Sequence, residues 1–329
     1  MVVPVRYVAR RLVWAVFTMW AISVVSFVII QLPPGDFATT YVNRLAQAGA
    51  SPGDIAHARQ QLGLDKSGFQ QYLSWMGRLL HGDLGQSLSL NRPVADVLQG
   101  DLAYTGVLVG AALIVSWCIA LPIGVYSAVH RYSPLDHVMT FLGFLGLAVP
   151  SFLLALILMY FSFDWFGISI DGLFSPQYET APWGFGKVFN MFEHLIVPAI
   201  VLGAAGMAHL MRIMRANLLD ELGKPYVVTA QAKGLPKWRV IRKYPVRVAL
   251  NPFASSIGLL VPQVVSASII VSVVLGLPTL GPRLLDALKA QDMFLAGAIV
   301  LFLGLLTVVG TLISDIVLMV LDPRIRHAG

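Results

Sequence analysis

Six long stretches without any Asp, Glu, Lys or Arg constrain this chain more than any other feature. They cover residues 12–35, 102–130, 137–163, 194–211, 248–282 and 293–314. Each reaches or approaches the roughly 20 residues that a helix needs to cross a hydrocarbon core of about 30 Å. Because lipid offers the backbone no hydrogen-bond partners, such stretches are expected to be helical. The sequence therefore predicts an all-α membrane protein with six transmembrane helices.

The composition excludes several other classes of protein. Charged residues make up 12% of the 329 positions, about half of the roughly 25% that is usual in soluble domains. Hydrophobic residues make up 57%, which excludes a soluble enzyme and a disordered chain. The single cysteine, Cys118, excludes a disulfide framework or a cysteine-based metal site within the chain.

The basic residues predict the orientation. Six spans place both termini on one side, and most of the 23 Lys and Arg residues lie there, nine of them in the loop of residues 212–247. By the positive-inside rule, both termini are predicted to be cytoplasmic. Topology then accounts for the net charge of +6, and no nucleic-acid partner is expected. The first span is expected to remain as an anchor, because its apolar run is too long for a signal peptide.

The unequal loops suggest a division of the chain into three parts. Residues 1–31 form the first transmembrane helix, residues 32–101 an extracytoplasmic segment, and residues 102–329 a core with the five other spans. A second outer loop, at about 164–192, is rich in aromatic residues, typical of an interfacial belt or of a docking surface for a soluble outer partner. The extracytoplasmic segment should contain an amphipathic helix that packs on the bundle or lies at the membrane surface. Its apolar residues, at helical spacing, are Tyr72, Leu73, Trp75, Met76, Leu79 and Leu80.

The loop of residues 212–247 is too polar to span the membrane and too regular for a linker. Gly234, followed by Leu235 and Pro236, should end one helix, and Trp238 should begin another. An apolar side is expected from Leu218, Leu219, Leu222, Val227 and Val228. Two short helices with many basic residues suit contact with a soluble partner, whereas the alternative is a basic loop on anionic lipid.

Residues 226–234, YVVTAQAKG, resemble the coupling loop of permease subunits in binding-protein-dependent ABC importers. The closest branch is the dipeptide and oligopeptide permeases, in their first or B-type subunit. In the general motif of the family, three residues separate Glu-Ala-Ala from a Gly. The matching positions here are Val228, Thr229, Ala230 and Gly234, so this chain keeps only the last Ala and the Gly. Further matching stretches follow in order over nearly the whole chain, at residues 34–36, 62–65, 71–72, 82–87, 92–94, 105, 150–152, 212, 215 and 322–326.

The resemblance implies a type I ABC importer permease in a bacterial inner membrane. The implied partners are a second homologous permease, two ABC ATPase subunits, an extracytoplasmic substrate-binding protein and membrane lipid. This chain has no G-x-x-x-x-G-K-[ST] loop, so it is expected to be a transport subunit rather than an enzyme. ATP-Mg would bind the ATPase subunits, and no cofactor or metal is expected in the chain itself. The alternatives are an ATPase-independent secondary transporter or channel and an intramembrane enzyme, for which repeats, paired charges and reactive clusters were not found.

The same resemblance assigns a coupling role to the loop. The assigned residues are Asp220, Glu221, Tyr226, Thr229, Ala230, Ala232, Lys233 and Gly234. The small residues Ala230 and Gly234 are expected to allow close approach to the ATPase. Asp220 and Glu221 are expected to open the coupling helix, either as capping charges at its positive end or as partner contacts.

The fifth span is unusually polar, and Gln263, Ser266 and Ser255 are candidates to line a translocation path. The alternative is that its small residues serve close helix packing. Peptides are the expected substrate, with oligosaccharides, opines and nickel as alternatives within the same machinery. Residues 33–40, PPGDFATT, depart from the Pro-Gly-Asp-Pro expected of a typical peptide permease. This departure favours a sugar as the substrate.

Overall fold

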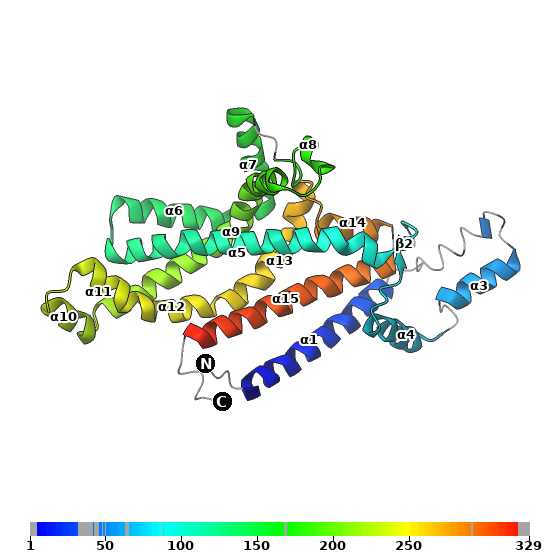
Figure 1. Ribbon diagram of the computed structural model, residues 1–329, viewed down its shortest axis with the longest axis horizontal. Helices are drawn as coiled ribbons and strands as arrows, with labels where there is room; N and C mark the ends of the chain where they lie inside the picture. Colours follow the sequence, from blue (N-terminus) through cyan, green and yellow to red (C-terminus); the bar gives the residue numbers. More distant parts are fainter. Residues whose placement is uncertain are drawn as a thin grey trace. The chain divides into compact units, whose positions relative to one another are not determined.

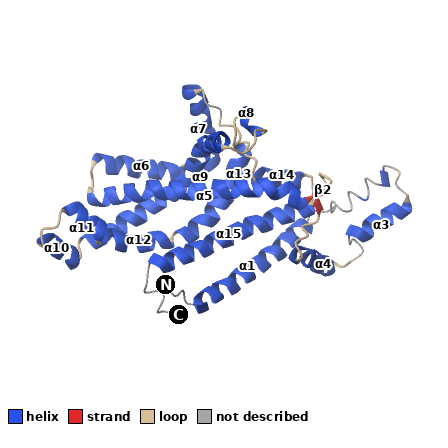
Figure 2. Cartoon of the chain, in the orientation of Figure 1, coloured by secondary structure: helices blue, strands red, loops and turns tan. Residues whose placement is uncertain are grey.

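The computed structural model describes residues 5–31, 42, 46–47, 49, 51–62, 66–87, 89–167, 170–290 and 292–321. The matching stretches at 34–36 and 322–326, and the departure at 33–40, lie outside these residues. The described chain is almost entirely helical, with one short hairpin of strands (Figure 2), which confirms the predicted all-α class. It divides into two units, the first with residues 1–11, 105–278 and 309–329 and the second with residues 12–104 and 279–308.

The helices of the chain are labelled in Figure 1. They are α1 (Val5–Gln31), α3 (Pro52–Leu62), α4 (Gly68–Leu80), α5 (Val94–Val129), α6 (Pro134–Ala148), α7 (Ser151–Phe166), α8 (Pro176–Glu179), α9 (Phe185–Leu222), α10 (Pro225–Ala232), α11 (Lys237–Lys243), α12 (Pro245–Ser255), α13 (Ile257–Val274), α14 (Leu280–Lys289) and α15 (Met293–Leu321). The strands β1 (Gln86–Ser87) and β2 (Arg92–Pro93) pair antiparallel, with Ser87 opposite Arg92.

Helix α9 is the centre of the first unit. It packs against α6, α7, α12 and α13 and runs between the end that carries α8 and the end that carries α10 (Figure 1). Its inner face contributes Leu210, Met214 and Leu218 to a core that also contains Phe253 of α12, and all four side chains are fully buried. This apolar core fixes the direction of α9, because large buried side chains in a close-packed interior leave little room for rotation.

Helices α5 and α9 approach so closely at Gly203 that no side chain fits between them. A Cβ atom on Gly203 would lie 2.6 Å from Ser116 Oγ and 3.3 Å from the carbonyl oxygen of Ala112. Small residues at helix crossings allow this kind of backbone contact within membranes.

We therefore expect Gly203→Ala to destabilise the first unit. The steric overlap costs about 1–3 kcal/mol and outweighs the gain of about 1 kcal/mol in helix propensity. The thermal unfolding midpoint of the detergent-purified protein should fall, and Ser116→Ala in the same chain should restore part of the loss. Gly110→Ala on α5, where a Cβ meets nothing within 4 Å, is the matched control. Equal midpoints for the two alanine variants would contradict the close approach.

The predicted third and fifth spans are not single straight helices. Within the described residues, four helices are long and apolar enough to cross a membrane, or six spans if two bent pairs each count as one. In the third span, α6 and α7 meet at 114°. Pro150 has no N–H group and restricts Val149 to an extended conformation (φ −84°, ψ 124°), so α6 ends there. The prediction of one helix over residues 137–163 is therefore wrong.

The fifth span bends by 55° between Phe253 and Gly258. Here the hydroxyl groups of Ser255 and Ser256 donate hydrogen bonds to the carbonyl oxygens of Pro252 (2.8 Å) and Phe253 (2.6 Å). Side chains that bond to the preceding turn in this way compete with the helical backbone pattern and bend it.

The second unit contains the predicted amphipathic helix, which is confirmed as α4. Its first turn is held by a capping box between Ser67 and Gln70. Near the start of α15 a fully buried carboxylate, Asp292, accepts hydrogen bonds from Ser87 and Ser89. The helix of the second span begins at Val94, before the charge-free stretch, where its Asp101 is paired with Arg283 at 2.7 Å. The predicted three-part division of the chain stays a prediction.

Candidate functional site

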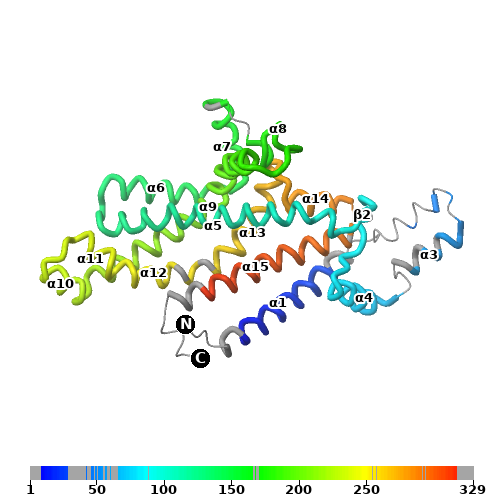
Figure 3. Tube along the Cα trace, in the orientation of Figure 1, coloured from blue at the N-terminus to red at the C-terminus, as the bar shows by residue number. Residues whose placement is uncertain are grey.

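The loop after α9 folds into a helical hairpin, as the sequence predicted. Helix α10 starts with Pro225 in its first turn, where the missing N–H group costs no hydrogen bond. Gly234 has φ +76° and reverses the chain towards α11, because its backbone can adopt the left-handed conformation without strain. The tube in Figure 3 follows the chain from α9 through this hairpin into α12.

The hairpin has a small core of its own. Val227 and Ala230 of α10 and Val240 of α11 are buried together, with Leu235 and Tyr244 packed against them. The small side chain of Ala230 therefore lets α10 approach α11, rather than an outside surface as expected. Nothing lies within 4 Å of a Cβ built on Gly234, so this position requires glycine for its conformation and not for lack of space.

One face of α10 is open to solvent. It presents Tyr226, Thr229, Ala232 and Lys233, and also Val228, which is 57% exposed. The expectation that Val228 lies on the inner apolar side is wrong, because consecutive positions on a helix point about 100° apart and Val227 occupies the core. This exposed face combines Val228 and Ala232 with the polar side chains of Tyr226, Thr229 and Lys233, a mixture suited to contact with another protein.

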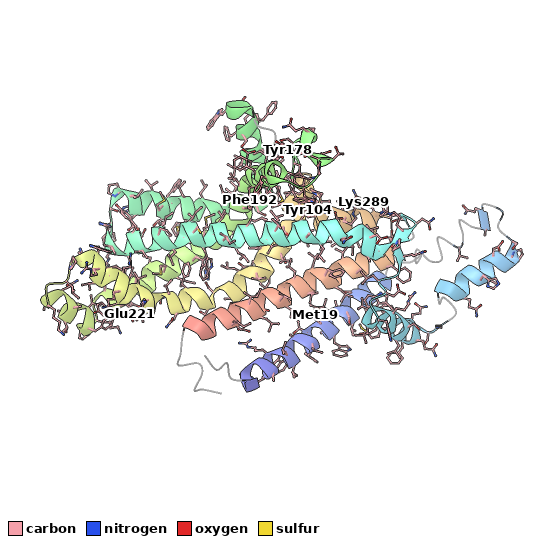
Figure 4. The ribbon with its side chains drawn as sticks, in the orientation of Figure 1. Met19, Tyr104, Tyr178, Phe192, Glu221 and Lys289 are labelled. Carbon is pink, nitrogen blue, oxygen red and sulfur yellow. The ribbon has the colours of Figure 1, made fainter. Side chains whose placement is uncertain are left out.

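Asp220 and Glu221 lie in the last turn of α9 and not at the start of the coupling helix. The predicted capping role is therefore wrong, since the end of a helix is its negative pole and does not favour acidic side chains. Glu221 instead accepts a hydrogen bond from the phenol of Tyr226, and Figure 4 labels Glu221 at this end of the first unit. Burial, and after it this hydrogen bond, raises the pKa of Tyr226 to about 12, so the phenol remains a donor at neutral pH.

This bond attaches α10 to the end of α9, and we expect Tyr226→Phe to loosen it. Loss of one such hydrogen bond costs about 1 kcal/mol, or about fivefold in local opening. Hydrogen–deuterium exchange of the α10 amides should accelerate by that factor. Tyr226→Phe combined with Glu221→Gln should be no faster than Tyr226→Phe alone, because both changes remove the same bond. Unchanged exchange in the single variant would show that the bond does not hold α10.

Helix α11 gives the hairpin a basic side. Trp238 is 59% exposed, and the guanidinium carbons of Arg239 and Arg242 lie 5.9 and 5.4 Å from the centre of its indole ring. Lys237 and Lys243 are the first and last residues of the same helix, and both are exposed. The exposed cations suit an acidic surface on a partner.

A groove of about 570 Å³ opens in the first unit where α6, α7, α9 and α13 meet. Gln263 lines it, and its role in a translocation path stays a prediction. Ser266 is exposed on the same helix but is not part of the lining. Ser255 is not part of the lining either, and its hydroxyl donates a hydrogen bond to the carbonyl oxygen of Pro252 at the helix bend. Ser268 and Ser272 are buried, so the close-packing interpretation holds for part of this span.

The sequence did not predict that a histidine and an arginine line the groove. His209 and Arg212, both exposed and one turn apart on α9, line it together with Ser151 of α7. The available signal was their spacing, since positions i and i+3 share a helix face. From its position after the fourth charge-free stretch, Arg212 is instead expected to open the cytoplasmic loop. Among the side chains that the structure describes, no three His, Cys, Asp or Glu residues lie close enough to hold a metal ion.

An ion pair connects α9 to the start of α6. Arg215 Nη2 lies 3.1 Å from Asp136 Oδ2, and the same oxygen accepts a hydrogen bond from the backbone N–H of Tyr132. The Asp136 side chain is 4% exposed and that of Arg215 is 34% exposed. Arg215 lies between the groove residue Arg212 and the end of α9 at Leu222, so both features share one helix.

The sequence of this chain is similar to known proteins over almost its whole length. Residues 120–327 match the family described as the binding-protein-dependent transport system inner membrane component, and residues 4–105 match its N-terminal companion family. The oligopeptide transport system permease protein AppB of Bacillus subtilis (strain 168) is 34% identical, over 98% of this chain and 99% of the relative. The dipeptide transport system permease protein DppB of Escherichia coli (strain K12) is 32% identical over the same shares. The probable D,D-dipeptide transport system permease protein DdpB of the same strain is 30% identical, over 98% of each chain.

Proposed function

This chain belongs to the family of binding-protein-dependent transport system inner membrane components, and on that premise we propose that it forms half of a peptide translocation path. Membership confirms the resemblance, the type I permease fold and the multi-pass location in the inner membrane. The chain is a permease subunit of an ABC importer and not its catalytic subunit. Relatives described as oligopeptide and dipeptide permeases support peptides as the substrate.

The observation that carries the mechanism is that one helix, α9, lines the groove and ends at the hairpin. His209 and Arg212 face the groove, and further along the same helix Glu221 accepts the hydrogen bond from Tyr226 that attaches α10. A rigid helix transmits displacement along its length, so a push on α10 reaches the groove. We place one of the two ATPase subunits, with its ATP-Mg, against the exposed face of α10, and we propose that this face and both termini are cytoplasmic.

The groove would form one wall of the path, and the second permease would close it. An extracytoplasmic binding protein would deliver the substrate to the opposite side. Arg212 and His209 suit the carboxylate of a peptide, which accepts charge-assisted hydrogen bonds. The guanidinium of Arg212 would repel a free nickel ion, and a neutral oligosaccharide would gain little binding energy from it. An opine also carries carboxylates and is the alternative that the groove supports next best.

A tagged version of the chain, purified in mild detergent from its own host, tests this proposal. We expect an ABC ATPase and a second permease to co-purify in comparable amounts. In proteoliposomes with the binding protein, uptake of a labelled dipeptide should require ATP. Uptake without ATP by the chain alone would instead support a secondary transporter or channel. ATP-dependent uptake of an oligosaccharide but not of peptides would contradict the substrate and leave the machinery intact.

A further inference from the structure

A second groove lies in the other unit, between α1 and α4. Its volume is about 610 Å³ and its lining is predominantly apolar. Three large side chains of each helix form most of it: Trp20, Phe27 and Val28 of α1, and Phe69, Tyr72 and Leu73 of α4. This groove shares no lining residue with the one assigned to the substrate, and it lies between the first span and the helix α4 of the segment that follows it.

The groove is built by specific contacts and not by loose packing. Tyr72 Oη and Ser23 Oγ share a hydrogen bond of 2.8 Å. The ring of Phe27 lies 5.3 Å from that of Tyr72 and 5.9 Å from that of Trp75, which is itself 8% exposed. These contacts hold one edge of α4 on α1, so the opening beside them has fixed walls.

The opposite edge of α4 leaves large apolar side chains uncovered. Phe69 is 72% exposed and Leu73 is 52% exposed, and the two lie four positions apart on one face. Trp20 across the groove is 53% exposed. Apolar exposure of this extent would be unfavourable in water, at about 25 cal/mol per Å².

Helix α1 indicates whether the groove faces water or lipid. This helix is a candidate span, and its exposed positions Val16, Phe17 and Trp20 continue the surface of the groove along the helix. The groove therefore opens onto a face that lies in lipid hydrocarbon. An amphipathic helix beside such a face belongs at the level of the headgroups, with its apolar edge towards the acyl chains.

The charges at α4 select the headgroup. Lys66, two residues before α4, and Arg78 within it are cationic, and α4 itself (Gly68–Leu80) contains no Asp or Glu, although Asp65 and Asp83 lie just outside it in the sequence. Lys66 directly precedes the capping residue of the turn that carries Phe69, and its Nζ lies 3.4 Å from Ser74 Oγ on the polar face of α4. We propose that the groove between α1 and α4 binds an acyl chain of an anionic phospholipid, with its phosphate beside Lys66.

Photolabelling tests the proposal on the full chain in lipid nanodiscs. The probe is phosphatidylglycerol with a diazirine in one acyl chain, and labelled peptides are mapped by mass spectrometry. We expect label on residues 20–28 and 68–73. Leu73→Gln should lower it several-fold, because an amide in the groove disfavours hydrocarbon. Leu80→Gln, on the same helix, 78% exposed and outside the groove, is the matched control and should leave the label unchanged.

Three outcomes would overturn the proposal. Label that is equally strong at the exposed positions of residues 12–17 and insensitive to Leu73→Gln would indicate ordinary surrounding lipid. An unlabelled groove that cross-links to another protein or to a second copy would identify a different occupant. Equal labelling by phosphatidylcholine and phosphatidylglycerol probes would remove the assigned role of Lys66. Phe69→Ser, at a more exposed position of the groove, repeats the test if Leu73→Gln reduces the yield of folded protein.

Discussion

Gly234→Val is expected to lower ATP-coupled transport more than tenfold, while the protein still inserts in the membrane. Gly234 has φ +76°, a conformation that costs an ordinary L-residue about 1–2 kcal/mol and a β-branched residue more. Its N–H group also closes the turn by donating to the carbonyl oxygen of Gln231 at 2.9 Å. Valine would relax the turn and separate α10 from α11, so the exposed face of α10 would lose its position.

The measurement is ATP-dependent uptake in proteoliposomes of the purified complex, with ATP hydrolysis recorded in the same vesicles. We expect hydrolysis to continue without a matching uptake of substrate. Gly223→Ala is the matched control, because Gly223 lies in the same loop with φ −84° and open space around it. It should transport at the level of the unchanged protein. Unaltered uptake by the Gly234→Val complex would refute the coupling assignment of the hairpin.

The parts of this site that the sequence predicted depend on local signals. Runs without charge indicate spans, and the Gly-Leu-Pro sequence at Gly234 indicates where one short helix ends and the next begins. The first signal acts through the side chains of about 20 consecutive residues and the second through the backbone of three, so both depend on neighbours in the sequence and survive in the folded chain. Gln263 was predicted for the same kind of reason, because an amide is costly in a span unless it meets protein or water.

The parts that the sequence did not predict depend on tertiary contacts. Nothing local distinguishes Ala230, which is buried against Val240, from an alanine at a docking surface. Asp220 and Glu221 were placed at the start of a helix because acids favour that position, but α9 continues to Leu222 and includes them. A helix of this length is decided by the packing of its apolar face over many turns, which outweighs single capping preferences.

Arg215→Ala is expected to be the most destabilising change in the path from hairpin to groove. It would leave Asp136, whose side chain is 4% exposed, with a backbone N–H donor from Tyr132 but no cation. Breaking a fully buried pair costs about 3–5 kcal/mol, and a loss on the order of 2 kcal/mol is expected here because Arg215 is one third exposed. The thermal unfolding midpoint of the purified protein should fall accordingly.

The partner change separates charge burial from packing. Asp136→Asn leaves Arg215 able to reach solvent, so its cost should be smaller. Asp136→Asn in the Arg215→Ala chain should restore part of the lost stability, since no charge then stays buried without a partner. A double variant as unstable as Arg215→Ala would show that the guanidinium acts by packing alone. The pair joins α9 to α6, and both helices line the groove. At a temperature where all variants are folded, those without the pair should therefore hydrolyse ATP with less transport per ATP than the unchanged complex.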